Sequence, residues 1–213
     1  MADLDFFFDP VCPWAWITSR WVVEVQELRG YTVSWKFISL KILNQDKMDY
    51  AAMPAGYKDV HAAGTSGLRV AGKARSVAGN DAVGKVYTAL GTSLHNRQER
   101  ELFVADIEGH IAGLLAEAGL PVDWASAVHD ESFDRLIADE TAIALERAGK
   151  DVGTPIITFN PGGLKESSFF GPVISTIPRG EEATKLWDAI ETIATASGMA
   201  ELKRSLRARP SFD

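Results

Sequence analysis

Cysteine is almost absent from this sequence, because Cys12 is its one cysteine among 213 residues. A single cysteine excludes a disulfide within the chain and a metal site built from several thiolates. Of the four histidines, His61, His110 and His129 do not show the short spacings typical of metal ligands. The sequence therefore predicts no resident metal, and any thiol chemistry depends on Cys12.

Long hydrophobic runs are also lacking. No apolar run approaches the roughly 20 residues that a membrane-spanning helix needs. The N-terminus carries Asp3 and Asp5 where a secretory signal carries basic residues. The chain has 29 acidic and 22 basic side chains, a formal net charge of −7, which disfavours nucleic acid and anionic lipid as partners. We expect a cytosolic protein with neither nucleic-acid nor membrane partners.

The composition that is present, with 46% hydrophobic and 24% charged residues, is typical of a folded globular protein. Residues 4–8 are mainly aromatic and predict a buried strand. After Pro13, apolar residues recur at three- and four-residue steps, which predicts a helix that ends before Gly30. Residues 31–38 predict a second strand, so this part of the chain is a βαβ unit with a parallel strand pair.

The pattern changes after the second strand. Residues from about 44 to 150 are rich in alanine and predict four or five helices. The breaks between these helices are predicted at Gly56, 79–80, 95–96 and 119–121.

A hairpin and a last helix complete the predicted fold. Residues 155–160 and 166–170 predict two paired strands, and a helix begins near residue 179. The fold class is therefore α/β, in the order βαβ, helical insertion, ββα. The predicted domains are an α/β domain of residues 1–43 and 151–213 and a helical insertion of residues 44–150.

Cys12 lies between the first strand and the first helix, directly before Pro13. The backbone N–H groups of a first helical turn are unpaired and the helix dipole is positive there, so both favour a thiolate. We therefore predict a reactive thiol whose pKa lies below the value of about 8.5 for free cysteine. The alternative is that Cys12 is a small buried residue that caps the helix without reacting.

Residues 6–16, with the sequence FFFDPVCPWAW, resemble the active-site segment of the DsbA-like branch of the thioredoxin superfamily. Within that branch the chain is most similar to the mycothiol-dependent reductases of the nitroreductase type. It is more distantly similar to kappa-class glutathione transferases and 2-hydroxychromene-2-carboxylate isomerases. The resemblance implies a thioredoxin fold interrupted by a helical domain. It extends over nearly the whole chain, in segments 17–21, 42–44, 94–96, 151–155, 169–173, 177–182 and 201–204.

Ala15 departs from the pattern of these oxidoreductases, whose Cys-x-x-Cys motif has its second cysteine at this position. On a helix that second thiol would lie beside Cys12 and attack a mixed disulfide formed there. Without it, Cys12 is limited to monothiol chemistry, in which it joins a partner sulfur and an external thiol releases it. Whether Ala15 is native or an engineered trap stays open.

The resemblance also implies the residues that surround the thiol. In the superfamily, the proline that matches Pro155 is cis and faces the reactive cysteine, and Thr154 before it offers backbone groups to a bound thiol. Trp14 is expected to wall the pocket, and Asn44 and Tyr57 to offer polar groups at its border. Taken alone, Asn44 is equally typical of a helix cap and Tyr57 of half-buried packing.

Three further residues are less specific. Pro13 belongs to the active-site motif and is included among the thiol-binding residues by resemblance. His95 ends a predicted helix, where it either contacts a ligand or, as a cation, stabilises the helix dipole. Asp9 either shifts the pKa of the Cys12 thiol or belongs to an ordinary Asp-Pro turn.

Together these observations predict a cytosolic thiol-disulfide oxidoreductase that uses Cys12 as a monothiol nucleophile. By resemblance its co-substrate is a low-molecular-weight thiol, mycothiol, and its substrate a small disulfide or a small electrophile such as a nitroaromatic. No tightly bound cofactor is expected. Two alternatives stay open: a kappa-class-like transferase or isomerase, where serine is usual in place of Cys12, and a thioredoxin-fold binding module without catalysis.

Overall fold

A four-stranded sheet with the order β2-β1-β3-β4 forms the centre of the computed structural model. Strand β1 (Leu4–Phe8) pairs parallel with β2 (Val33–Phe37) and antiparallel with β3 (Ile156–Phe159). Strand β3 pairs antiparallel with β4 (Ser167–Phe170). Helix α1 (Pro13–Arg29) connects the parallel pair, which confirms the predicted βαβ unit. The antiparallel pairing of β3 with β4 confirms the predicted hairpin.

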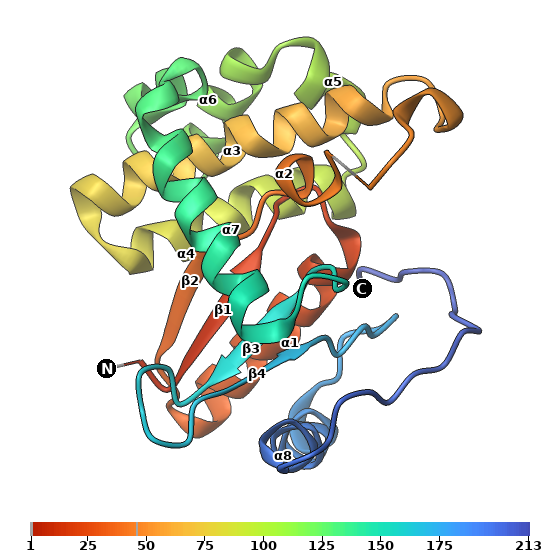
Figure 1. Cartoon of the computed structure of the whole chain (residues 1–213). Coiled ribbons are helices and arrows are strands. Elements are labelled where there is room, and N and C mark those ends of the chain that lie inside the picture. The colour runs from red at the N-terminus through yellow and green to blue at the C-terminus, as the bar shows by residue number, and fades with distance from the viewer. Residues whose placement is uncertain (1, 46) are drawn as a thin grey trace.

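Helices occupy most of the chain between β2 and β3. The structure describes residues 2–45 and 47–213. The helical elements that follow β2 are α2 (Leu40–Asn44), a 3-10 turn (Tyr50–Ala52), α3 (Tyr57–Ala78), α4 (Asn80–Gly91), a π-helical turn (Thr92–Asn96), α5 (Arg100–Ala105), α6 (Ile107–Glu117), two 3-10 turns (Val122–His129 and Glu131–Phe133) and α7 (Asp134–Ala148). Helix α8 (Gly180–Thr195) follows the hairpin. In Figure 1 the helices α3 to α6 gather at the end of the sheet toward which β1 runs.

The predicted helix breaks are confirmed, with two differences. Helix α2 begins at Leu40, before the expected start of the helical region at 44, because Ser39 caps it by accepting a hydrogen bond from the Ile42 N–H. A further break separates α5 from α6 at Asp106, whose carboxylate caps α6 by accepting from the Gly109 N–H. Both caps are short polar residues, Ser39 just after β2 and Asp106 between two helices.

The two faces of the sheet are covered by different helices (Figure 1). Phe6 and its alternate neighbours on β1 belong to the main hydrophobic core, together with Trp21 of α1 and Trp187 of α8. Phe7 points the other way, into a smaller cluster with Ala144 of α7. The period-2 alternation of β1 therefore places α1 and α8 on one face and α7 on the other.

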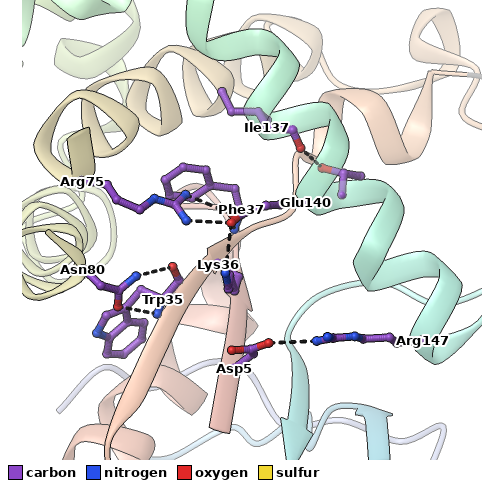
Figure 2. Close-up of polar contacts among 10 residues, drawn as sticks. Asp5, Trp35, Lys36, Phe37, Arg75, Asn80, Ile137, Glu140 and Arg147 are labelled. Carbon is purple, nitrogen blue, oxygen red and sulfur yellow. Dashed lines mark hydrogen bonds and ion pairs between the residues drawn. The ribbon is translucent and has the colours of Figure 1, made fainter. Parts of the chain in front are cut away.

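A buried ion-pair centre joins the helices α3 and α7 to β2 (Figure 2). The Glu140 carboxylate accepts from both terminal nitrogens of Arg75, at 2.6 and 3.0 Å, and from the Phe37 N–H at 2.8 Å. Lys36 Nζ lies 3.3 Å from the same carboxylate. We call Glu140, Arg75, Lys36 and the Phe37 N–H the Glu140 centre.

The exposed edge of β2 is partly paired by a side chain. Asn80 Oδ1 accepts from the Trp35 N–H at 2.8 Å, and Asn80 Nδ2 donates to the Trp35 carbonyl at 3.0 Å, as Figure 2 shows. This amide satisfies the backbone groups that an edge strand leaves unpaired. The helical region is thus fixed to the sheet by polar contacts as well as by the apolar core.

Candidate functional site

Cys12 caps the N-terminus of α1. Its backbone is extended, Pro13 is the first helical residue, and its Sγ accepts from the Ala15 N–H at 3.4 Å. The loop before it closes on itself, because the Cys12 N–H donates to the Asp9 carbonyl at 3.1 Å. The predicted position of the thiol at the helix start is confirmed.

The turn before β3 lies directly against this thiol. The peptide bond between Thr154 and Pro155 is cis, as the resemblance implied, and Cys12 Sγ donates to the Thr154 carbonyl at 3.6 Å. Thr154 Oγ1 in turn donates to the Phe7 carbonyl at 3.2 Å, which fixes the turn to β1. A second cis bond, between Gly171 and Pro172, was not predicted from the sequence.

The predicted acidity of Cys12 is wrong for this structure. The pKa of the Cys12 thiol is raised to about 12, chiefly by burial and to a smaller extent by the nearby Asp9 charge, although the Ala15 N–H acts in the opposite direction. The side chain has the helix-start contact that stabilises a thiolate, but it is 5% exposed, so the loss of solvation outweighs that contact. In this closed form Cys12 is a neutral thiol.

Asp9 is fully buried beside the thiol, and sequence reasoning left its role undecided. Its two carboxylate oxygens accept from the Val11 N–H at 3.0 Å and from the Leu40 N–H at 2.7 Å. The pKa of Asp9 is raised to about 7, because the effect of burial exceeds the lowering by the two backbone hydrogen bonds. The carboxyl therefore ties the Cys12 loop to the start of α2, and the turn interpretation alone is insufficient.

Ala15 lies one helical turn beyond Cys12 and is completely buried. Because its N–H contacts Cys12 Sγ, a side chain at this position starts within a few ångströms of the thiol. This is the geometry from which a second cysteine would reach a mixed disulfide on Cys12.

The residues predicted to bind the thiol lie in different parts of the structure. Trp14 is half-buried against the core, and its role as a pocket wall stays a prediction, while Pro13 is half-buried at the first position of α1. Asn44 lines a cavity of about 720 Å³ that extends to Gly153, next to Thr154. The structure thus brings Asn44 toward the cis-proline turn, from the end of α2.

Tyr57 belongs to a cluster at the start of α3. Its ring lies 4.7 Å from that of His61, and His61 Nδ1 is 2.8 Å from the Tyr50 hydroxyl. Burial lowers the pKa of His61, so the imidazole is the neutral partner of the Tyr50 hydroxyl. No contact between Tyr57 and Cys12 is found among the described residues, and its role at the pocket border stays a prediction.

His95 does not act on a helix dipole as a cation. Burial lowers the pKa of His95 to about 4, so the ring is neutral near pH 7, and the dipole interpretation is wrong. Its Nε2 donates to the Pro10 carbonyl at 2.8 Å, and its ring stacks on Trp16 with centroids 6.0 Å apart. His95 therefore positions the Cys12 loop from the π-helical turn.

Within residues 2–45 and 47–213, no three His, Cys, Asp or Glu side chains are grouped so that they could hold a metal ion. Across the same ranges, the helices are too short or too polar to cross a bilayer.

Comparison with known proteins places these features in a family. The family model described as "Rv2466c-like: Mycothiol-dependent nitroreductase Rv2466c" matches residues 11–204. The chain is also 27% identical over 206 residues to "Uncharacterized protein Rv2286c" of Mycobacterium tuberculosis (strain ATCC 25618 / H37Rv). That alignment covers 96% of this chain and 82% of the relative.

Solved structures agree on the fold. The cytosolic disulfide reductase DsbM from Pseudomonas aeruginosa is similar with a TM-score of 0.57 and 17% identity, over 88% of this chain and 98% of that one. Its structure with GSH gives a TM-score of 0.51 and 19% identity, over 75% and 86% of the two chains. The fold is therefore the DsbA-like thioredoxin fold with a helical insertion, as the sequence predicted.

Proposed function

The chain belongs to the Rv2466c-like family of mycothiol-dependent nitroreductases, a family of redox enzymes, and on that premise we propose that it is a monothiol reductase. In this proposal Cys12 forms a mixed disulfide with a low-molecular-weight thiol, which is mycothiol. The substrate is a small disulfide or a small electrophile such as a nitroaromatic, and the reaction takes place in the cytosol.

One observation carries the proposal: Cys12 Sγ lies between the Ala15 N–H, at 3.4 Å, and the Thr154 carbonyl, at 3.6 Å. The first group stabilises a thiolate and the second precedes cis Pro155. These contacts support Cys12 as the nucleophile and the Thr154–Pro155 turn as the part that accepts a bound thiol, with Ala15 at the position of a resolving thiol.

The chemistry on a disulfide then runs in two exchanges. The Cys12 thiolate attacks one sulfur of a small disulfide, so that a new S–S bond forms on Cys12 and the other sulfur leaves as a thiolate. An external mycothiol thiolate next attacks the mixed disulfide and restores the Cys12 thiolate. With a nitroaromatic, two thiols together supply two electrons and two protons, become a disulfide, and leave a nitroso group and water.

The thiolate needed for the first exchange requires an open site. Burial is the largest cause of the raised Cys12 pKa, while the N–H groups of Ala15 and Trp14 lower it. When a ligand or a movement exposes the sulfur to water, the contribution of burial falls and that of the helix start remains. We therefore assign the closed form to the resting enzyme and the reactive thiolate to an open form.

A hollow near the cis-proline turn suits a small polar thiol. The hollow lined by Asn44 extends to Gly153, beside the Thr154–Pro155 turn, and offers both an amide and charged side chains to a polar ligand. The DsbM structure described as containing GSH supports a peptide-like thiol as ligand of this fold. Asn44 and Tyr57 are proposed to hold that ligand rather than to react.

One observation favours a second candidate, a binding module without turnover. The neutral, 5% exposed Cys12 of the closed structure is what a passive helix cap would also show. The two candidates differ in whether the sulfur reacts when a small disulfide is supplied.

The test is intact-mass measurement after incubation with the disulfides of mycothiol, glutathione and coenzyme A in parallel. We expect one adduct per chain, formed fastest with the mycothiol disulfide, removed by added mycothiol, and absent from the Cys12→Ser variant. If no disulfide yields an adduct while free cysteine in the same tube reacts, the binding module is correct and the reductase proposal is wrong.

A further inference from the structure

The chain after α8 returns to the end of the molecule where α1 begins (Figure 1). Its last part, residues 205–213, is fixed there by backbone groups. The Ser211 N–H donates to the Ser175 carbonyl at 2.8 Å, in the loop that follows β4. The Phe212 carbonyl accepts from Asn96 Nδ2 at 2.7 Å, on the π-helical turn. We call residues 205–213 the strap.

The strap contacts Trp14, which follows Cys12, and His95, which is hydrogen-bonded to the loop before Cys12. The phenyl ring of Phe212 lies 5.5 Å from the ring of His95, whose Nε2 donates to the Pro10 carbonyl. The Arg207 guanidinium lies 6.0 Å from the centroid of the Trp14 ring, in the first turn after Cys12. The strap therefore lies beside the Cys12 loop and contacts two side chains that border it.

The same strap has few buried contacts of its own. Residues 205–209 are exposed, and only the short stretch from Pro210 to Phe212 is half-buried, with Phe212 packed on the main core. A segment held by so few buried groups opens at low cost in free energy, unlike the helices beneath it. The strap is thus suited to open and close over a rigid site.

We propose that the strap limits access to Cys12 by size, so that small thiols and small disulfides reach the sulfur while disulfides on folded proteins do not. This inference rests on the proposed function, because it names the class of partner that the Cys12 site accepts. The family match ends at residue 204, so the strap lies beyond the part of the chain that the family describes.

The test compares how fast two reagents alkylate Cys12 in the folded protein. One is iodoacetamide, and the other is a maleimide joined to a polyethylene glycol of several kilodaltons, each normalised to its rate with free cysteine. In a variant that ends at residue 204, we expect the ratio of the bulky to the small rate to rise by about tenfold or more, because opening no longer has to displace the strap.

Point variants guard against misfolding of the shortened chain. Phe212→Ala combined with Arg207→Ala removes both side-chain contacts to the residues beside Cys12 and should raise the ratio in the same direction. Leu206→Ala is the matched control, because the Leu206 side chain belongs to the strap and is 85% exposed. We expect no change in the ratio for this control, and each variant is first shown to unfold cooperatively.

An unchanged ratio in the double variant, or an equal rise for both reagents, would overturn size selection by the strap. Alkylation of Cys12 needs no turnover, so this outcome is separable from failure of the reductase proposal. In that case the mixed disulfides of the intact-mass experiment would still form while the strap would have no effect on access.

Discussion

Two buried carboxylates, Glu140 and Asp9, have different kinds of hydrogen-bond partners. Glu140 accepts from Arg75, Lys36 and the Phe37 N–H, so that its charge is paired with cations (Figure 2). Asp9 accepts from two backbone N–H groups, and within the described ranges no cation pairs with it. The first arrangement holds the helical region on the sheet, and the second leaves a titratable group beside Cys12.

The two carboxylates differ in whether they are expected to titrate near neutral pH. A buried charge without a cation is poorly solvated, and burial accordingly raises the pKa of Asp9 to about 7. Such a group changes its charge near neutral pH, next to a thiol whose pKa that charge raises. The protonation of Asp9 is therefore expected to affect Cys12, whereas the Glu140 centre should affect only stability.

The largest expected effect on stability follows from loss of the Glu140 centre. Glu140→Ala leaves Arg75 and Lys36 without their anion and should lower the free energy of unfolding by about 3 to 5 kcal/mol. Urea unfolding measures this loss. Asp139→Ala is the matched control on the same helix, because its ion pair with Arg135 is exposed, and we expect little change. Equal losses in the two variants would show that the Glu140 centre does not hold the fold.

Asp9→Asn tests the second carboxylate through the pH dependence of stability. A carboxyl whose pKa is about 7 in the folded state and 3.8 when unfolded stabilises the fold at low pH. That stabilisation is lost as the pH rises through 7. From pH 5 to pH 8, the advantage in unfolding free energy of the natural chain over Asp9→Asn should shrink by about 2 to 3 kcal/mol.

The comparison with Asp9→Asn isolates Asp9, because His95, whose lowered pKa has the opposite effect on stability, is present in both proteins. The same variant should also lower the pKa of Cys12, seen as faster iodoacetamide alkylation at pH 8. A constant stability difference across this pH range would contradict the assignment of a raised pKa to Asp9.

A smaller effect on stability is expected from a substitution at Gly64, where α3 packs against Asp9. A Cβ on Gly64 would lie 2.6 Å from Asp9 Oδ1, which cannot move without losing a backbone hydrogen bond. Gly64→Ala should therefore destabilise the chain by about 1 to 2 kcal/mol, since overpacking outweighs the gain in helix propensity. Thermal or urea unfolding measures the change.

Gly113→Ala on α6 is the control for this comparison, because nothing lies within 4 Å of its Cβ position. We expect a stabilisation of up to about 1 kcal/mol, the ordinary gain of alanine over glycine in a helix. If Gly64→Ala is as stabilising as the control, Asp9 can move away from α3. The packing of α3 against Asp9 is then looser than the structure indicates.

Much of the fold was predictable because its signals are local. The aromatic run before Asp9, Pro13 at the helix start and Gly30 after its end identify β1 and α1, and Gly30 has the positive φ of 70° that such a helix end requires. The position of Cys12 at the helix start follows from the same signals. Most of the predicted helix breaks, at Gly56, 79–80 and 119–121, followed from glycine and proline in the same way, whereas the break at Asp106 was not predicted.

The rest of the site depends on contacts between residues far apart in the sequence. The pKa of Cys12 is set by burial, which the order of residues around it does not specify, so the expected acidic thiol was wrong. Asp9 is linked to α2 because its carboxylate accepts from the Leu40 N–H. His95 is linked to the Cys12 loop because its Nε2 donates to the Pro10 carbonyl. The strap has no periodic pattern, and its one signal is Phe212, an isolated aromatic residue in a polar segment.

The lifetime of the mixed disulfide tests whether Cys12 works as a monothiol that an external thiol must release. The mycothiol adduct is formed on the chain with Ala15 and on the Ala15→Cys variant, free thiol is removed, and intact mass is followed with time. We predict that the adduct persists on the chain with Ala15, while the variant expels mycothiol and forms a disulfide between its two cysteines. An adduct that persists equally on both proteins, or that the chain with Ala15 releases without added thiol, would contradict the monothiol mechanism.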